Sequence, residues 1–258
     1  MNPAMHRTPA RLAGLAALGA AAGLMAVVMV GCTTAPAPSA DDLARYAAVV
    51  ANPIRTDQDR RMDESRRPAE LLAFAMVKPG MQVLDVAAGG GFTSQVLTLA
   101  VGPTGRVWAQ AQRPGPVLTQ RLADHPQANL ILVQQPLEDP IPAQAPPLDL
   151  ITIILNYHDI TFLPVDRPKM NGRLLAALKP GGRLVVVDHS GRSGTGISEA
   201  RTLHRIEESV VVAELRQAGF VLEAKGDFLR NPADPRDESS NNPKVPTDKF
   251  ALRFVKAP

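Results

Sequence analysis

The chain has 258 residues, enough for one α/β domain with a buried core and short for two domains. Hydrophobic residues make up 45% of it, which excludes a wholly disordered protein. The formal net charge is only +3, and no dense run of Lys or Arg forms a basic face. The composition therefore argues against binding to nucleic acid.

The N-terminal segment has the pattern of an export signal. Arg7 and Arg11 give it a positive start, and residues 12–30 form an apolar run without charge. The run ends at Gly31 and Cys32, which resembles the lipobox of bacterial lipoproteins, whose cysteine receives a lipid. An uncleaved transmembrane helix is the alternative, because the run has about the length that spans a bilayer.

We prefer the lipoprotein hypothesis because Cys32 is the only cysteine and a tether of Thr, Ala, Pro and Ser follows it. The hypothesis predicts a signal peptide at 1–31, a flexible tether at 32–41 and a folded domain at 42–258. It places the protein in the bacterial cell envelope, anchored by lipid on the periplasmic side of the inner or outer membrane. A lone cysteine excludes an intramolecular disulfide, so the core alone must hold the domain.

Helix-like and strand-like segments alternate beyond the tether. A first helix is capped by Asp41 or Asp42 and runs to about Ala51. A charged stretch at 57–67 leads to a second helix, which begins at Pro68. The remaining pattern predicts, in chain order, strand 82–86, helix 93–101, strand 106–109, helix 117–124, strands 130–133 and 148–155, helix 166–178, strand 184–187, helix 207–218, and strands 220–229 and 250–255.

This order predicts an α/β, Rossmann-like, doubly wound sheet of about seven strands, mostly parallel, with helices on both faces. The last two strands have only a loop rich in Pro, Asn and Asp between them, at 231–248. Without a crossover helix they should pair antiparallel, which makes the C-terminal strand an antiparallel edge strand. Ligands of such sheets bind beyond the carboxyl ends of the strands.

A strand runs directly into a glycine-rich turn and then a helix at residues 85–93. Glycines let the backbone approach a ligand, and the helix N-terminus offers free N–H groups to an anion. A dinucleotide fingerprint would need a third glycine where Ser94 stands, which disfavours a nicotinamide cofactor. The segment instead resembles motif I of class I S-adenosylmethionine-dependent methyltransferases, in which an acid at the strand end precedes a glycine loop.

Four further motifs stand in the order that this family has. They precede the first, second, fifth and sixth strands: Lys78-Pro79-Gly80, Gly102-Pro103-Thr104-Gly105, Leu178-Lys179-Pro180-Gly181-Gly182 and Gln217-Ala218-Gly219-Phe220. The resemblance implies S-adenosylmethionine as the cofactor, with its methionine end at Asp85, Ala87, Gly89, Gly90 and Gly91. An unrelated Rossmann-like fold is the alternative.

Two acids of the family's cofactor site are missing. Ala111 stands where an acid usually meets the ribose, and Gln134 and Gln135 follow the third strand where the family often has Asp. The resemblance therefore places Gln110 and Gln112 at the ribose, where their amides can bind without charge.

Polar residues follow the fourth and fifth strands, and a third group follows a loop rich in Gly and Ser at 191–198. The groups are Asn156-Tyr157-His158-Asp159, Asp188-His189-Ser190 and Leu203-His204-Arg205-Ile206. Together they resemble a bacterial subgroup of predicted exported, lipoprotein-like methyltransferases. Structural roles are the alternative, with Asp159 capping a turn, Asp188 accepting backbone N–H bonds and His204 packing beside its helix.

We assign the catalytic role to these residues. A carboxylate beside His raises its pKa and fixes its tautomer, so His158 or His189 is the candidate general base, with Asp159 and His204 beside them. Asn156 would orient the acceptor, and the loop 191–198 would act as a lid. Some small-molecule O-methyltransferases hold a divalent metal at these strand ends. Asp159, Asp188 and His189 offer suitable ligands, but the sequence alone leads us to assign no metal ligand.

Two hypotheses on function follow. The first is a methyltransferase acting on an unknown small-molecule or envelope acceptor. The second is a non-enzymatic envelope lipoprotein with a degenerate methyltransferase fold that binds another ligand or a partner protein. The missing acids and the lipid anchor motivate the second, and the sequence leaves the oligomeric state open.

Overall fold

A computed structural model describes residues 39–257 of the chain. The predicted signal peptide, the lipidation site Cys32 and most of the tether lie outside the described residues. No helix within 39–257 combines the length and the apolar character needed to cross a membrane.

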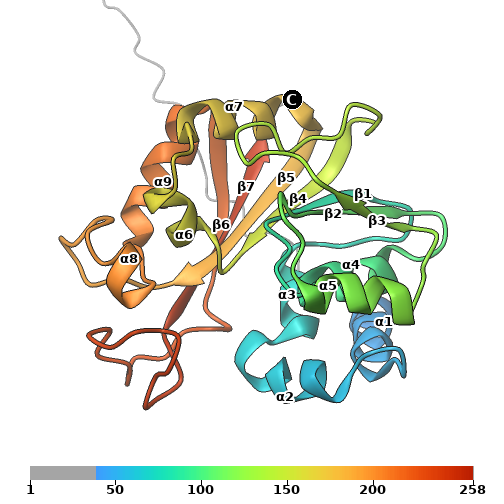
Figure 1. The fold of residues 1–258 in the computed structure, drawn as a ribbon, viewed down its shortest axis with the longest axis horizontal. Helices are drawn as coiled ribbons and strands as arrows, with labels where there is room; N and C mark the ends of the chain where they lie inside the picture. Colours follow the sequence, from blue (N-terminus) through green and yellow to red (C-terminus); the bar gives the residue numbers. More distant parts are fainter. Residues whose placement is uncertain (1–38, 258) are drawn as a thin grey trace, which may run out of the picture. The chain divides into compact units, whose positions relative to one another are not determined.

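Seven strands form one sheet in the order β3-β2-β1-β4-β5-β7-β6 (Figure 1). They are β1 (Gln82–Val86), β2 (Arg106–Gln110), β3 (Leu130–Val133), β4 (Leu148–Ile154), β5 (Leu178–His189), β6 (Phe220–Gly226) and β7 (Lys249–Lys256). The first five strands pair parallel, and β7 runs antiparallel to both β5 and β6. The predicted Rossmann-like, mostly parallel sheet with an antiparallel C-terminal strand is therefore confirmed. β7 lies between β5 and β6, so β6 occupies the edge itself.

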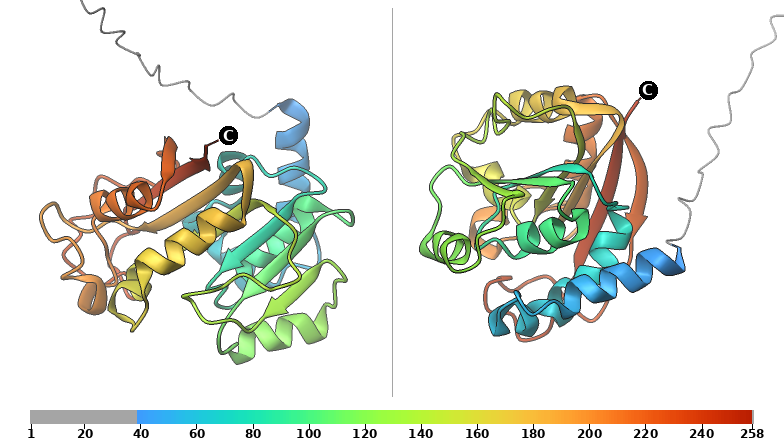
Figure 2. Two further views of the ribbon diagram at one scale, coloured as in Figure 1. Left: turned by 90° about the horizontal axis from the view of Figure 1, so that it is seen from above. Right: turned by 90° about the vertical axis from the view of Figure 1, so that its right-hand side faces the viewer.

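Helices cover both faces of this sheet (Figure 1 and Figure 2). They are α1 (Ala40–Ala51), α2 (Asp57–Arg66), α3 (Pro68–Phe74), α4 (Phe92–Val101), α5 (Pro116–Asp124), α6 (Tyr157–Phe162), α7 (Arg167–Ala177), α8 (Ala200–Leu203) and α9 (Glu208–Gln217). The apolar stripes of α1, α3 and α4 pack on one face, and those of α6, α7 and α9 pack on the other.

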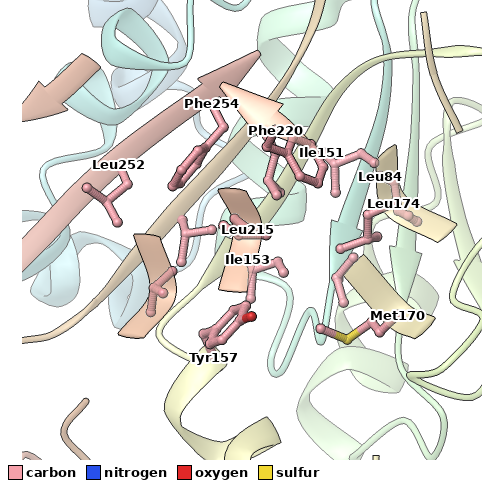
Figure 3. Packing of buried hydrophobic residues seen from close by; sticks show 14 of the residues in the cluster. Leu84, Ile151, Ile153, Tyr157, Met170, Leu174, Leu215, Phe220, Leu252 and Phe254 are labelled. Atoms are coloured by element: carbon pink, nitrogen blue, oxygen red, sulfur yellow. The ribbon is translucent and has the colours of Figure 1, made fainter. Parts of the chain in front are cut away.

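The core lies in two layers because successive side chains of a strand point to opposite faces. In β4, Ile151 and Ile153 face α7 and α9, whereas Leu150 faces α4. Figure 3 shows the layer between the sheet and helices α7 and α9, in which Leu174 of α7 and Leu215 of α9 are fully buried. Full burial of each such side chain stabilises the fold by about 1.5–3 kcal/mol.

Three short helices were not predicted from the sequence: α2, α6 and α8. The charged stretch at 57–67 was expected only to connect to the next helix. It is itself helical, because Thr56 and Asp59 form a reciprocal capping box that begins α2. A second difference concerns α1, whose N-cap is Ser39 rather than Asp41 or Asp42. The Ser39 hydroxyl accepts the backbone N–H of Asp42, the third residue of the helix, and the Asp42 carboxylate accepts the Ser39 backbone N–H.

Candidate active site

A cavity of about 460 Å³ opens at the glycine loop, and we call it the glycine cavity. Its walls come from the ends of β1 and β4, from the loop itself, and from α2 and α5. Its lining includes Met62, Arg66, Asp85, Ala87, Gly89, Gly90, Arg121, Leu155 and Asn156. Small-molecule sites commonly have volumes of about 300–1,000 Å³, so the cavity has the size of a ligand site.

Asp85 lies at the floor of the glycine cavity and is only 2% exposed. Thr152, its register partner on β4, donates a hydrogen bond of 2.7 Å to Oδ1, and Ser94 of α4 donates one of 2.6 Å to Oδ2. Burial raises the pKa of Asp85 to about 6, against the two hydroxyl donors, which lower it. The carboxylate is therefore mostly ionised at neutral pH.

The glycine loop offers fewer free amides than expected, because Gln110 occupies two of its N–H groups. Ala87 N–H donates to the Gln110 side-chain Oε1 at 2.8 Å, and Ala88 N–H donates to the Gln110 carbonyl at 2.8 Å. Gly91 N–H donates to the Ala88 carbonyl. Within the turn itself, the N–H groups of Gly89 and Gly90 have no acceptor in the part of the chain that the structure describes.

The expectation that Gln110 and Gln112 bind the cofactor ribose is not matched by their positions. Gln110 is fully buried, and its Nε2 donates to the Gln135 carbonyl at 2.7 Å, so both ends of its amide are used within the protein. Gln112 is exposed, and neither residue lines the glycine cavity. Gly91 also lies outside the lining, because Leu118 of α5 packs against its Cα.

A buried ion pair supports the loop from outside. Arg121 of α5 donates to both carboxylate oxygens of Asp59 in α2, at 2.8 and 2.7 Å, and its Nε donates to the Gly90 carbonyl at 2.9 Å. Neither residue was singled out from the sequence. Ala87, which stands where the family has a glycine, has a φ of 53°, so the turn keeps the left-handed conformation with an alanine.

A second cavity, also of about 460 Å³, lies beside the first, and we call it the histidine cavity. It contains four of the five residues predicted as catalytic: His158, Asp159, His189 and His204. Met62, Arg66 and Leu155 line both cavities. The structure thus brings the strand-end histidines together next to the glycine loop.

His158 lies between two carboxylates. Its Nδ1 is 2.6 Å from Asp188 Oδ1, its backbone N–H donates to Asp188 Oδ2 at 2.8 Å, and its Nε2 is 3.1 Å from Asp159 Oδ1. Burial alone would lower the pKa of His158, but the bonds to Asp159 and Asp188 outweigh it and raise the pKa to about 9. With both ring nitrogens engaged, His158 is poorly placed to accept a proton.

His189 is in the opposite situation. Its Nδ1 is 2.9 Å from Thr247 Oγ1, and its Nε2 has no hydrogen-bond partner among residues 39–257. Burial, and then the charges of Lys249 and His158, lower the pKa of His189 to about 2. Of the two histidines proposed as the base, His189 is thus the one with an unengaged ring nitrogen.

Two cations that the sequence analysis missed face the histidine cavity. Lys249 is 6% exposed, and Arg66 is half-buried. Within the described residues neither forms an ion pair, and Lys249 Nζ donates only to the Thr247 carbonyl at 3.2 Å. Burial, and then the charge of Arg66, lower the pKa of Lys249. No local pattern identifies either residue, because each comes from a charged or strand segment far from the histidines.

Two further expectations are corrected by position. Asn156 lines the glycine cavity, where its Nδ2 donates to the Ala87 and Ile154 carbonyls, so it braces the loop. The loop 191–198, expected as a lid, does not line the histidine cavity, because Glu207 binds its Gly194 and Gly196 amides. Residues from 240–247 line that side of the histidine cavity instead.

Asp159, Asp188 and His189, which the sequence offered as possible metal ligands without an assignment, do not form a common ligand group among the described residues. Asp188 is fully buried behind His158. Both of its carboxylate oxygens are already engaged, one by the His158 backbone N–H and the other by the His158 ring and the His189 backbone N–H. The ligand atoms that do converge are those of His158, Asp159 and His204, which all lie within 4.8 Å of one another.

Comparison with known proteins agrees with the fold. No protein-family model matches the chain. The ubiquinone/menaquinone biosynthesis C-methyltransferase UbiE of Burkholderia multivorans is 31% identical over 121 residues, 46% of this chain and 47% of that protein. The chain spans about half the length of the curated relatives it matches.

Solved structures resemble a larger part of the chain. A SAM-dependent methyltransferase from Aquifex aeolicus has a TM-score of 0.57 at 20% identity and covers 79% of this chain and 100% of its own. A protein from Bordetella parapertussis, described as a possible exported protein, has a TM-score of 0.52 at 15% identity and covers 84% of this chain and 79% of its own. The chain thus shares the fold of S-adenosylmethionine-dependent methyltransferases, and it resembles a C-methyltransferase in sequence over about half its length.

Proposed function

We propose that the chain transfers a methyl group from S-adenosylmethionine to a small anionic acceptor bound in the histidine cavity. The observation that carries this proposal is that the glycine cavity and the histidine cavity share Met62, Arg66 and Leu155 in their walls. A donor in the first cavity and an acceptor in the second would meet at these residues. Such positioning supplies much of the rate of a displacement reaction.

The glycine cavity fits the methionine end of the cofactor. The free N–H groups of Gly89 and Gly90 suit a carboxylate, and the ionised Asp85 carboxylate suits an ammonium group. The end of β2 contributes no carboxylate for the ribose, since Gln110 is turned into the loop and Ala111 has no polar side chain. When bound, S-adenosylmethionine supplies an electrophilic methyl group.

His189 is the residue placed to remove a proton from an O–H or N–H acceptor, and a bound anion that offsets the charges of Lys249 and His158 would raise its lowered pKa toward the range of a general base. Its Nε2 has no partner in the described chain, while Thr247 holds its Nδ1 and thereby its ring orientation. The neighbouring His158 is held between two carboxylates and does not compete for that proton.

An anionic acceptor follows from the charges of the cavity wall. Burial, and then the charge of Arg66, lower the pKa of Lys249, and neither cation forms an ion pair within the described residues, although Asp248 and Asp234 act on Lys249 at longer range. A buried cation without a partner is costly, so a bound anion would relieve this cost. A carboxylate or phosphate on the acceptor has the required charge.

Isothermal titration of the purified chain with S-adenosylmethionine tests the proposal. We expect a Kd at or below about 1 mM, in the range of enzyme–substrate affinities. Asp85→Asn should weaken binding by about 10-fold or more, because a charge-assisted hydrogen bond is lost. Asp139→Asn, which alters an exposed ion pair with Arg173, is the matched control and should bind as the wild type does. An absence of heat at millimolar ligand would contradict the proposal.

The non-enzymatic hypothesis keeps one specific observation in its favour, the use of Gln110 inside the loop rather than at a ribose. A thermal-shift panel separates the two hypotheses, because ligand binding raises the melting temperature by mass action. A shift with S-adenosylmethionine or its demethylated product supports the enzyme. A shift only with other compounds supports the alternative.

We also propose that Cys32 anchors the protein to a membrane on the periplasmic side. The apolar run before Cys32 supports this location, as does the likeness to the possible exported protein of Bordetella parapertussis. Cys32→Ser should move the protein out of the membrane fraction; unchanged fractionation would refute the anchor.

A further inference from the structure

Three potential metal ligands converge at one wall of the histidine cavity. His158 Nε2 and His204 Nδ1 each lie 3.1 Å from the same oxygen, Asp159 Oδ1. His158 and Asp159 belong to α6, and His204 directly follows α8. The three ligand atoms all lie within 4.8 Å of one another, and all three residues line the cavity.

Asp188 orients the first of these ligands. Its Oδ2 accepts the His158 backbone N–H, and its Oδ1 lies 2.6 Å from His158 Nδ1. A proton on Nδ1 leaves the lone pair of Nε2 directed toward Asp159. A carboxylate behind the distal nitrogen of a histidine is the usual support of a metal-binding imidazole.

The arrangement can hold a cation at the point where the three atoms meet. Without a metal, Asp159 Oδ1 must receive hydrogen bonds from His158 and His204, and His158 must carry a proton on both nitrogens. A divalent ion takes the place of those protons, since metal binding releases protons from its ligands.

We propose that His158, Asp159 and His204 bind one divalent transition-metal ion whose open coordination positions face the histidine cavity. Two imidazoles and one carboxylate favour ions such as Zn²⁺, Fe²⁺ or Co²⁺ over Mg²⁺ and Ca²⁺, which prefer oxygen ligands.

Three protein ligands leave positions for an oxygen atom of a bound molecule. Arg66 and Lys249 line the same cavity, so the bound molecule would be an anion. The identity of the bound molecule rests on the proposed function, because it makes the ion the site where the acceptor's oxygen binds. The binding of the metal ion does not depend on the proposed function.

Equilibrium dialysis of the full purified chain against Co²⁺, after removal of metals with a chelator, tests the proposal. The readouts are the metal content per chain and the visible absorption of bound Co²⁺. We expect one Co²⁺ per wild-type chain and none in His204→Ala, which is the safer variant because His204 is partly exposed. Asp188→Asn should weaken the affinity by about 10- to 100-fold.

Two controls define the outcome. His189→Ala alters the same cavity without removing a proposed ligand, and its ring centroid is 6.0 Å from that of His158, so it should retain the ion. His125→Ala lies outside the cavity lining and should also retain it. Less than stoichiometric binding by the wild type, or undiminished binding by His204→Ala, overturns the proposal. Circular dichroism of each variant shows that a loss of metal is not a loss of fold.

Titration of the same samples with S-adenosylmethionine separates the two proposals. Cofactor binding without Co²⁺ binding overturns the metal site alone. Co²⁺ binding without cofactor binding overturns the methyltransferase proposal and leaves the metal site standing.

Discussion

Replacing Arg121 by Met tests whether a buried ion pair holds the glycine cavity together. Arg121 donates two hydrogen bonds to Asp59 and one to the Gly90 carbonyl, and the side chains of the pair are 7% and 1% exposed. Met keeps most of the aliphatic volume and removes the charge. Asp59 is then left buried with only the Thr56 backbone and hydroxyl contacts of its capping box.

The magnitude follows from this uncompensated charge. Breaking one side of a buried pair costs about 3–5 kcal/mol, a large share of the roughly 5–15 kcal/mol that stabilises a typical domain. Burial alone would raise the pKa of Asp59, but the bonds from Arg121 and Thr56 lower it below its usual range. The stability that this shift contributes is present above the pKa of the unfolded carboxyl and is lost as the pH falls through the folded value.

Urea unfolding followed by circular dichroism at neutral pH measures the effect. Arg173→Met is the control, because its pair with Asp139 has side chains 50% and 44% exposed and should contribute about 1 kcal/mol or less. Asp59→Asn/Arg121→Met should be less destabilised than the sum of its single changes, since no charge stays buried. A loss below about 1 kcal/mol in Arg121→Met would refute the reasoning.

Three other predictions concern the glycine loop. Ala87→Gly should be as stable as the wild type or up to about 1 kcal/mol more stable in urea, because a positive φ costs a residue with a side chain about 1–2 kcal/mol; a clear loss of stability would count against this. Gln110→Ala should destabilise by about 1–3 kcal/mol, since the Ala87 N–H and the Gln135 carbonyl lose their partner, whereas the exposed Gln112→Ala should change stability by less than about 0.5 kcal/mol. Affinity for S-adenosylmethionine, measured by calorimetry, should fall as the pH drops below about 6, because Asp85, whose pKa is raised to about 6, then loses its charge. Asp85→Asn should lack this dependence, and the folded state, which binds that proton more tightly than the unfolded state, should not lose stability through Asp85 over the same interval.

Most elements with a periodic apolar pattern were predicted near their observed positions, but β5, predicted at 184–187, extends over Leu178–His189, and β6, predicted at 220–229, ends at Gly226. β1 and β3 begin and end at the predicted residues, and β4 ends one residue earlier than predicted. α2 could not be predicted in this way, because Asp59 is its only buried residue. Its helical form depends on a capping box at its start and on Arg121 in a distant helix.

The sequence predicted which residues of the candidate site lie near one another, as far as the order of the strands decides this. Adjacent parallel strands end at the same edge, so polar residues after β4 and β5 had to lie near one another. The direction of each side chain was not predictable. Gln110 ends the right strand for ribose binding, yet its side chain faces the loop, where it accepts the Ala87 N–H and donates to the Gln135 carbonyl.

The sequence by itself determined the order of the strands and of the amphipathic helices, the glycine turn after β1 and the polar residues at the strand ends, because local periodicity and turn chemistry specify them. Only the tertiary structure decided that Arg66 and Lys249 line one cavity, that Asp59 pairs with Arg121, and that His158, Asp159 and His204 share one point in space. Such contacts depend on how α2, α8 and the start of β7 pack near the carboxyl ends of β4 and β5. Long-range packing of single side chains leaves no repeating pattern along the chain from which it could be inferred.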